Sequence, residues 1–403
     1  MSGEQPDFYF NPWDEAFKVN PYPHYKALHS GPPRMINLMA PIALIGKYDD
    51  AIRVLTDHDT FTGVKPDIPW INQQFEIFRG APILQNSDPP VHTRLRRVIS
   101  KAFTPRMIAS MEPHIQQVTD ELFDAARARG ELEVMADIAN ALPVIVIAEI
   151  LGVPRDEYAK FKSWCDGFVA GQSNPPGMPT PAETHEANEA LRSYFAEEIE
   201  KRKRKPANDL LSMMVAAEEA GGETLTPDEL LAFVVLLLIA GNETTTNLVG
   251  NGMLALARNP DQLARLRSYP ALMPKAIEEM MRYDPPIHVS LALPSVRNPV
   301  EIGGLRLEPG TLMFVILAAA NRDPARFRDP DKFDIARDPN PHLSFGEGIH
   351  HCLGAPLARL EGRVVFNTAL KKFPQLRMTE PDAPPRYKGS YFFRGLKELR
   401  MAI

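Results

Sequence analysis

The stretch "HLSFGEGIHHCLGAPLAR", residues 342–359, holds Cys352, one of only two cysteines in the chain, among three histidines and three glycines. A helical apolar pattern begins at Leu353, so Cys352 is expected at or just before a helix N-terminus, where free N–H groups and the helix dipole favour a thiolate. The preceding "FGEG" (345–348) is too rich in glycine for a helix or strand and predicts a tight turn that brings the backbone close to a flat object. The stretch therefore predicts a chemical role for Cys352.

Two other roles compete with cofactor binding. A zinc site would use Cys352, His350 and His351, but no second cysteine pair lies at zinc-finger or zinc-ribbon spacing. A nucleophilic cysteine would leave the glycine-rich turn unexplained. The other cysteine, Cys165, is interpreted as a half-buried helix residue, and two cysteines are too few for a disulfide framework, which fits a reducing cytoplasm.

The composition predicts one soluble globular domain over residues 1–403. Hydrophobic residues make up 44% of the chain and charged residues 24%, and no repeat or long linker divides it. A formal charge of -6 argues against a nucleic-acid partner. We expect neither a signal peptide nor a membrane anchor, and we interpret the one basic run, "KRKRK" (201–205), as a solvated helix end.

Helical periodicity dominates residues 88–285, and short strand-like segments lie near 35–60, 295–318 and 385–403. The fold class predicted is mainly α with a small β region (α+β), with the strands in a small, mostly antiparallel sheet. The proline-rich segment 173–181 separates two amphipathic helices and is either a plain loop or a lid.

A buried helix of about 33 residues, roughly 50 Å long, is predicted to begin after Thr226, where Glu229 completes a capping box. In its middle stands the polar segment "AGNETTTN" (240–247). Gly241 costs a helix interior about 1 kcal/mol relative to alanine, which suggests that something approaches the backbone there. An acid next to a hydroxyl, Glu243 and Thr244, is suited to passing protons into an apolar pocket. The alternative is a polar notch with internal hydrogen bonds.

Two charged pairs lie at helical spacing. Glu279 and Arg282 are three residues apart, and an exposed pair of this kind contributes little. His92 and Arg96 are four apart, which fits either a carboxylate clamp or a solvated face.

Together these segments resemble the cytochrome P450 family. "FGEGIHHCLG" (345–354) matches the pattern of that family's heme-binding loop, F-G-x-G-x-H-x-C-x-G, at every fixed position. "AGNETT" (240–245) resembles its oxygen-activation segment, Glu279-x-x-Arg282 its helix-borne ion pair, and His92-x-x-x-Arg96 the propionate-binding pair of its bacterial soluble members. The resemblance covers essentially the whole chain and implies a triangular fold with a long central helix over a heme and short antiparallel sheets.

The resemblance implies heme b (iron protoporphyrin IX), with Cys352 as the axial ligand of the iron. Residues implied in heme binding besides Cys352 are His350, His92, Arg96, Phe345, Gly346, Gly348 and Gly354. The implied catalytic residues are Ala240 and Gly241 at the oxygen site and Thr244, with Glu243 behind it, in proton delivery. Glu279, Arg282 and Arg337 would form a structural ion network on the cysteine side.

One position departs from the family. Many bacterial members carry a propionate-binding arginine where this chain has Pro294. Arg297, three residues later, either reaches the heme by another path or leaves that contact missing.

The positions that correspond to the family's substrate-facing residues fall in 63–84, the long helix, 287–293 and 390–393. They are mainly apolar, as expected for a lipophilic molecule such as a terpenoid, steroid, fatty acid or polyketide. Candidate pocket residues are Phe233, Leu237, Ile287, Val289 and Phe392, and His288, Ser290 and Tyr391 either orient a polar group or are bonded locally.

The implied function is an O2-dependent monooxygenase that hydroxylates or epoxidises a small hydrophobic molecule. The implied partners are a separate ferredoxin and its NAD(P)H-dependent reductase, and a cytoplasmic monomer is expected. The ferredoxin would dock on the cysteine side, near Arg359 and Arg363. The alternatives are a peroxide-driven heme peroxygenase, a nitric oxide reductase and a non-catalytic heme or small-molecule binding protein, and the Glu243–Thr244 pair argues against all three.

Overall fold

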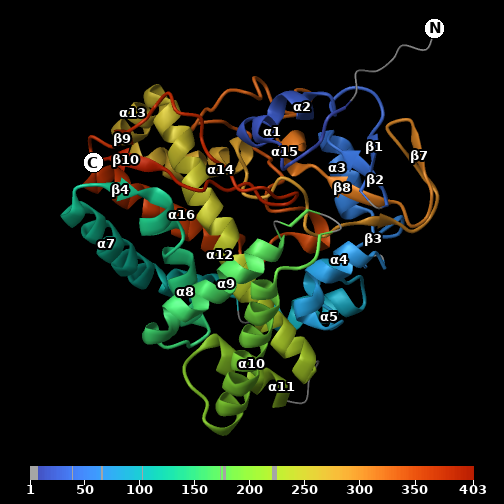
Figure 1. Ribbon diagram of the computed structural model, residues 1–403, viewed down its shortest axis with the longest axis horizontal. Helices are drawn as coiled ribbons and strands as arrows, with labels where there is room; N and C mark the ends of the chain where they lie inside the picture. The colour runs from blue at the N-terminus through green and yellow to red at the C-terminus, as the bar shows by residue number, and fades with distance from the viewer. Residues whose placement is uncertain are drawn as a thin grey trace.

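The computed structural model describes residues 8–38, 40–64, 67–101, 103–172, 174–175, 178–219 and 225–403. Helices predominate in this part of the chain, as predicted, and Figure 1 shows an outline that narrows from a broad edge with the strands towards α10 and α11. The helices are α1 Glu15–Val19, α2 Tyr22–Lys26, α3 Tyr48–Thr56, α4 Pro69–Gln74, α5 Val91–Ser100, α6 Pro105–Ser110, α7 Glu112–Arg129, α8 Leu142–Ile150, α9 Tyr158–Gln172, α10 Ala182–Arg204, α11 Leu210–Glu219, α12 Pro227–Arg258, α13 Pro260–Ser268, α14 Met273–Tyr283, α15 Leu317–Ala320 and α16 Ala355–Lys372.

The strands of the described residues form three small sheets, in the order β1-β2-β8-β5-β3, β4-β10-β9 and β6-β7. All pairings are antiparallel except that of β2 with β8, which joins two segments far apart in the sequence. The predicted strand region 295–318 divides, because β6 and β7 make a hairpin of their own while β5 and β8 enter the main sheet. The strands are β1 Arg34–Asn37, β2 Pro41–Ile45, β3 Phe61–Thr62, β4 Leu132–Glu133, β5 Ser295–Val296, β6 Val300–Ile302, β7 Leu305–Leu307, β8 Leu312–Val315, β9 Arg377–Met378 and β10 Arg400–Ala402.

The long helix α12 has the bounds that its sequence predicts. Thr226 Oγ1 accepts a hydrogen bond from the Glu229 backbone N–H at 3.2 Å, and Glu229 Oε2 accepts one from the Thr226 N–H at 2.8 Å, so both members of the capping box bond. Among the described helices α12 alone is long and apolar enough to cross a membrane, but 72% of its most apolar window is buried inside the protein. It packs against α8, α14 and α16 as a core helix.

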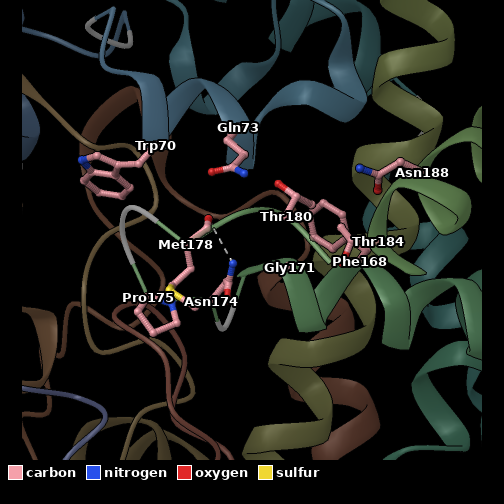
Figure 2. Close-up of a pocket in the computed structure, with 10 residues that line it drawn as sticks. All are labelled: Trp70, Gln73, Phe168, Gly171, Asn174, Pro175, Met178, Thr180, Thr184 and Asn188. Carbon is pink, nitrogen blue, oxygen red and sulfur yellow. Dashed lines mark hydrogen bonds between the residues drawn. The ribbon is translucent and has the colours of Figure 1, made fainter. Parts of the chain in front are cut away.

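The proline-rich connector joins α9 to α10, the two helices that the sequence predicts on either side of it. Its residues Ser173, Pro176 and Gly177 lie outside the described residues. In the rest, Asn174 Nδ2 donates to the backbone oxygen of Pro179 at 2.8 Å and braces the segment. Figure 2 shows that it borders a small pocket, with Trp70 and Gln73 on the side of α4. Whether this segment acts as a loop or a lid stays a prediction.

Candidate active site

A cavity of about 240 Å³ separates the middle of α12 from the loop 345–354, and its accessible walls are mostly apolar. Ala240 is accessible although it lies halfway along a buried helix, because it faces this cavity. The structure thus brings the two most distinctive segments of the sequence to one space. Predicted site residues that line the cavity are Arg96, Phe233, Leu237, Ala240, Gly241, Thr244, Ile287, Phe345, Gly346, His350, Cys352 and Gly354.

Cys352 is held by the loop that precedes α16. Its backbone N–H donates to the oxygen of Phe345 at 2.7 Å, which closes the glycine-rich turn. The thiol is enclosed by protein yet accessible from the cavity. Burial raises the pKa of Cys352, and the backbone N–H groups of Gly354 and Ala355 and the positive charge of Arg96 oppose that rise. A cation at the sulfur would therefore stabilise the thiolate.

On the opposite wall, α12 turns two faces to different surroundings. Thr244 lines the cavity and its Oγ1 donates to the Ala240 backbone oxygen at 2.8 Å, the backward bond expected of a threonine in a helix. Gly241 packs beside α8, where an added Cβ would meet Ile147 Cγ1 at 3.4 Å, an ordinary van der Waals contact. Glu243 is 5% exposed and outside the cavity lining, where its Oε1 accepts from Asn247 Nδ2 at 3.3 Å.

Histidines from two segments meet at one edge of the cavity. The rings of His92 on α5 and His350 lie 4.8 Å apart at 72°, and the Nε2 atoms of both are buried without a partner among the described residues. Burial lowers the pKa of each to about 4, so both are neutral at pH 7. Arg96, one turn after His92, makes a long contact of 3.5 Å to the backbone oxygen of Ile349.

Arg297 is bonded elsewhere. Its Nη2 donates to Asp88 Oδ2 at 2.5 Å, and Asp88 also accepts from the Gly63 N–H at 2.8 Å. Arg297 is not among the residues that line the cavity, and the backbone oxygen of Pro294 accepts from the Met313 N–H in the sheet. In this structure Arg297 therefore holds the segment before α5 and lies outside the cavity wall.

The ion pair of Glu279 and Arg282 on α14 is fully buried, whereas ion pairs at this helical spacing usually lie on an exposed surface. Arg282 Nε and Nη2 each donate to Glu279 at 2.8 Å, and both side chains are 0% exposed. Arg337 Nε joins them at 3.0 Å from Glu279 Oε2. The three residues predicted as an ion network are thus in direct contact, away from the cavity lining.

Two predicted pocket residues lie away from the cavity wall. Val289 forms a bridge with Ile316, and the Phe392 ring packs 5.9 Å from that of Phe314. His288 is bonded to Tyr25 at 3.0 Å, whereas Ser290 lines the cavity.

The sequence reasoning missed Glu361, which lines the cavity from α16 and is 2% exposed. Burial raises its pKa to about 8 and its Oε2 has no partner in the described part of the chain. The available signal was an acid at 361 between the apolar positions Leu357, Leu360 and Val364 of a predicted helix, which indicates a carboxyl group near the buried face.

Comparison with known proteins identifies relatives of this arrangement. The family model described as "Cytochrome P450" matches residues 31–160, 178–268 and 271–398. A putative cytochrome P450 from Bacillus subtilis, YjiB, is 40% identical over 89% of this chain and 88% of its own length. The cytochrome P450 monooxygenase PikC of Streptomyces venezuelae is 37% identical over 96% and 91%. The crystal structure of CYP109E1 from Bacillus megaterium in complex with testosterone has a TM-score of 0.86 at 33% identity and covers 96% of this chain and 99% of that one.

The residues around the cavity fit the heme that such a family carries. The accessible thiol of Cys352 stands at an apolar wall, as an iron ligand needs. Arg96 gathers at one edge with the Nε2 atoms of His92 and His350, which no described residue bonds, and the three groups are suited to carboxylates.

Proposed function

The chain belongs to the cytochrome P450 family and is a heme-thiolate monooxygenase of small hydrophobic molecules, and from this premise we propose the roles of its residues. Cys352 would hold the iron of a bound heme through its sulfur. His92, Arg96 and His350 hold the propionates, and Phe345 with Gly346, Gly348 and Gly354 encloses the sulfur. The observation that carries this assignment is the position of Cys352 at the cavity wall, with Thr244 on the wall formed by α12.

The bound heme supplies the activation of O2 and the transfer of one oxygen atom to the substrate. Thr244 places a hydroxyl in the cavity, and Glu243 holds a carboxylate one residue away on the far side of α12. This pair moves protons into the cavity, while Ala240 and Gly241 leave room for oxygen beside the helix. The Glu279–Arg282–Arg337 network fixes the segment 328–340, which follows α15, and takes no part in the chemistry.

The substrate we propose is a lipophilic molecule with few polar groups. Phe233, Leu237 and Ile287 line the cavity, whose accessible wall is mainly apolar. Ser290 and Gln85 are two of the polar, uncharged side chains in its wall, and both suit a hydroxyl or carbonyl group. The relative that was crystallised with testosterone supports a lipophilic substrate with few polar groups.

Electrons come from a separate ferredoxin and its reductase in the cytoplasm. We place the docking surface on the cysteine side, near α16. There Arg359 is paired with Glu278 at 2.7 Å, and Arg363 with Glu112 at 2.7 Å. These pairs partly neutralise the arginines, so an acidic partner has to replace the two glutamates when it binds.

The carbon monoxide difference spectrum of the dithionite-reduced protein tests the assignment. We expect the strongly red-shifted Soret band of a thiolate-ligated heme in the wild type and its loss in Cys352→Ser. Cys165→Ser is the matched control, because Cys165, interpreted from the sequence as half-buried, is fully buried in the helical core at 1% exposure and is not among the residues that line the cavity. Retention of the band in Cys352→Ser would refute the ligand assignment. Testosterone and myristic acid, added to the oxidised protein, test the substrate class through a shift of the heme absorption.

A further inference from the structure

Three polar side chains, Glu243, Asn247 and Asn251, lie four residues apart along one face of α12. They are 5%, 0% and 2% exposed. A polar group buried in this way costs free energy unless it is hydrogen-bonded. This row, which we term the polar face of α12, therefore needs partners along its length.

The two asparagines satisfy their nitrogens and leave their oxygens unpaired. Asn247 Nδ2 donates to Glu243 Oε1 at 3.3 Å, and Asn251 Nδ2 donates to the backbone oxygens of Asp284 at 3.2 Å and Arg394 at 3.0 Å. Because these neighbours are acceptors, each amide must turn its nitrogen towards them. Both Oδ1 atoms are buried without a partner among the described residues. Two such acceptors one helical turn apart suit a bridging water, which donates two hydrogens.

The two ends of the polar face adjoin different spaces. Thr244, next to Glu243, lines the active-site cavity. Asn251 lines a second, surface cavity of about 530 Å³ whose walls also carry Asp284 and the exposed Lys26. Between the two ends Gly395 covers Asn247, where a Cβ would lie 2.0 Å from Oδ1. A glycine at this point keeps side-chain atoms away from the amide oxygen.

Glu243 also has a cationic partner. Lys388 Nζ lies 3.3 Å from Glu243 Oε1, and the lysine side chain is 33% exposed. This ion pair holds the carboxylate at the inner end of the polar face. Because Lys388 reaches solvent, it also offers protons a second, shorter route between solvent and Glu243.

We propose that the polar face of α12 carries a string of water molecules that brings solvent protons from the surface cavity to Glu243. Asn247 and Asn251 are positioning residues that orient the waters, and Lys388 positions the carboxylate. The inference rests on the proposed function, because it assigns the proton source of the Glu243–Thr244 pair. Eight residues of helix span about 12 Å, which a few waters bridge.

The proton balance requires such a source. Insertion of one oxygen atom consumes O2, two electrons from the ferredoxin and two protons, and gives the oxygenated product and water. A proton that enters at the surface cavity passes from water to water and protonates the Glu243 carboxylate. Glu243 then releases it towards the Thr244 hydroxyl and returns to its ionised form, ready for the next.

A crystal structure that resolves ordered water tests the first half of the proposal without turnover. We expect a water within hydrogen-bond distance of both Asn247 Oδ1 and Asn251 Oδ1 in the wild type, and its loss in Asn251→Leu. A dry contact between the two amides in the wild type would overturn the proposal.

Oxygen consumption with a surrogate ferredoxin and reductase, in H2O and in D2O, tests the second half. We expect Asn251→Leu to slow consumption several-fold and to enlarge the solvent isotope effect, whereas Lys26→Met, which alters the same surface cavity, leaves both unchanged. If Lys388→Met slows consumption while Asn251→Leu does not, protons enter beside Lys388 and the polar face is not the route. An intact carbon monoxide band in each variant separates this outcome from a failure of the heme assignment.

Discussion

Gly348 is the residue at which the loop around Cys352 is most constrained. It has a φ of +67°, and a Cβ there would lie 2.7 Å from the backbone oxygen of Leu55, which cannot move cheaply. We expect Gly348→Ala to lower the unfolding free energy by about 1–3 kcal/mol and to weaken heme retention. Gly304→Ala is the control, because its φ is +87° but no atom of the described residues lies within 4 Å of the added Cβ. Urea denaturation and heme content measure both effects, and equal losses in the two variants would contradict the role of the clash.

Glu361 makes the stability of the protein depend on pH. Burial raises its pKa from 4.5 to about 8, so the folded protein keeps a proton that the unfolded chain releases above 4.5. Its contribution is complete below pH 4.5 and is lost as the pH rises through 8, with a total of roughly 5 kcal/mol. We expect Glu361→Gln to flatten this decline, measured as the difference in urea midpoint between pH 4.5 and pH 8. If the urea midpoint falls equally in wild type and variant, Glu361 is not the source of the pH dependence.

At the residue level, the sequence predicted best those residues that belong to a fixed local pattern. Cys352, His350 and Thr244 all reach the cavity because their spacing within a turn or helix decides their direction. Val289 and Phe392 lie off its wall because the pairing of distant strands, which no local pattern encodes, decides where they point. The ion pair of Arg297 with Asp88 likewise joins residues far apart in the sequence, so no local pattern predicts it.

Helix α12 owes its start to the capping box of Thr226 and Glu229. We expect Thr226→Ala to lower the unfolding free energy by about 1 kcal/mol, because the N–H of Glu229 loses its acceptor. Thr226→Ser keeps the hydroxyl and should stay near the wild type. Chemical denaturation compares the three proteins, and a Ser variant as unstable as the Ala variant would show that the methyl group, not the cap, is what matters.

Helix bounds followed from caps, prolines and periodicity, whereas partners between elements did not. The basic run at the end of α10 shows the difference. Its position was correct, but the prediction that it is solvated fails at Arg202, whose side chain is 13% exposed and bonds Asp209 at 2.9 Å and the oxygen of Gly152 at 2.8 Å. Similarly, no local signal predicted that β4, within the helical region, pairs with β10 at the end of the chain.

At the scale of the whole molecule, the buried ion network ties α14 to the segment that leads towards the Cys352 loop. Glu279 accepts from Arg282, Arg337 and Asn340, and from the backbone N–H of Asp334 at 2.8 Å. Arg282 in turn donates to the backbone oxygens of Asn321, Pro330 and Lys332. The network thus replaces regular secondary structure in fixing a long irregular segment.

Removing one partner of a buried ion pair leaves the other charge unpaired, which costs about 3–5 kcal/mol. We therefore expect Glu279→Ala to lower the unfolding free energy by that amount and to reduce heme retention, because the segment 328–340 loses its anchor. Glu189→Ala is the matched control, since the Arg79–Glu189 pair is 57% and 61% exposed and its loss should cost less than about 1 kcal/mol. Denaturant titration of the heme-loaded proteins measures both. A Glu279→Ala protein as stable as the control would mean that backbone packing, not the ions, holds this segment in place.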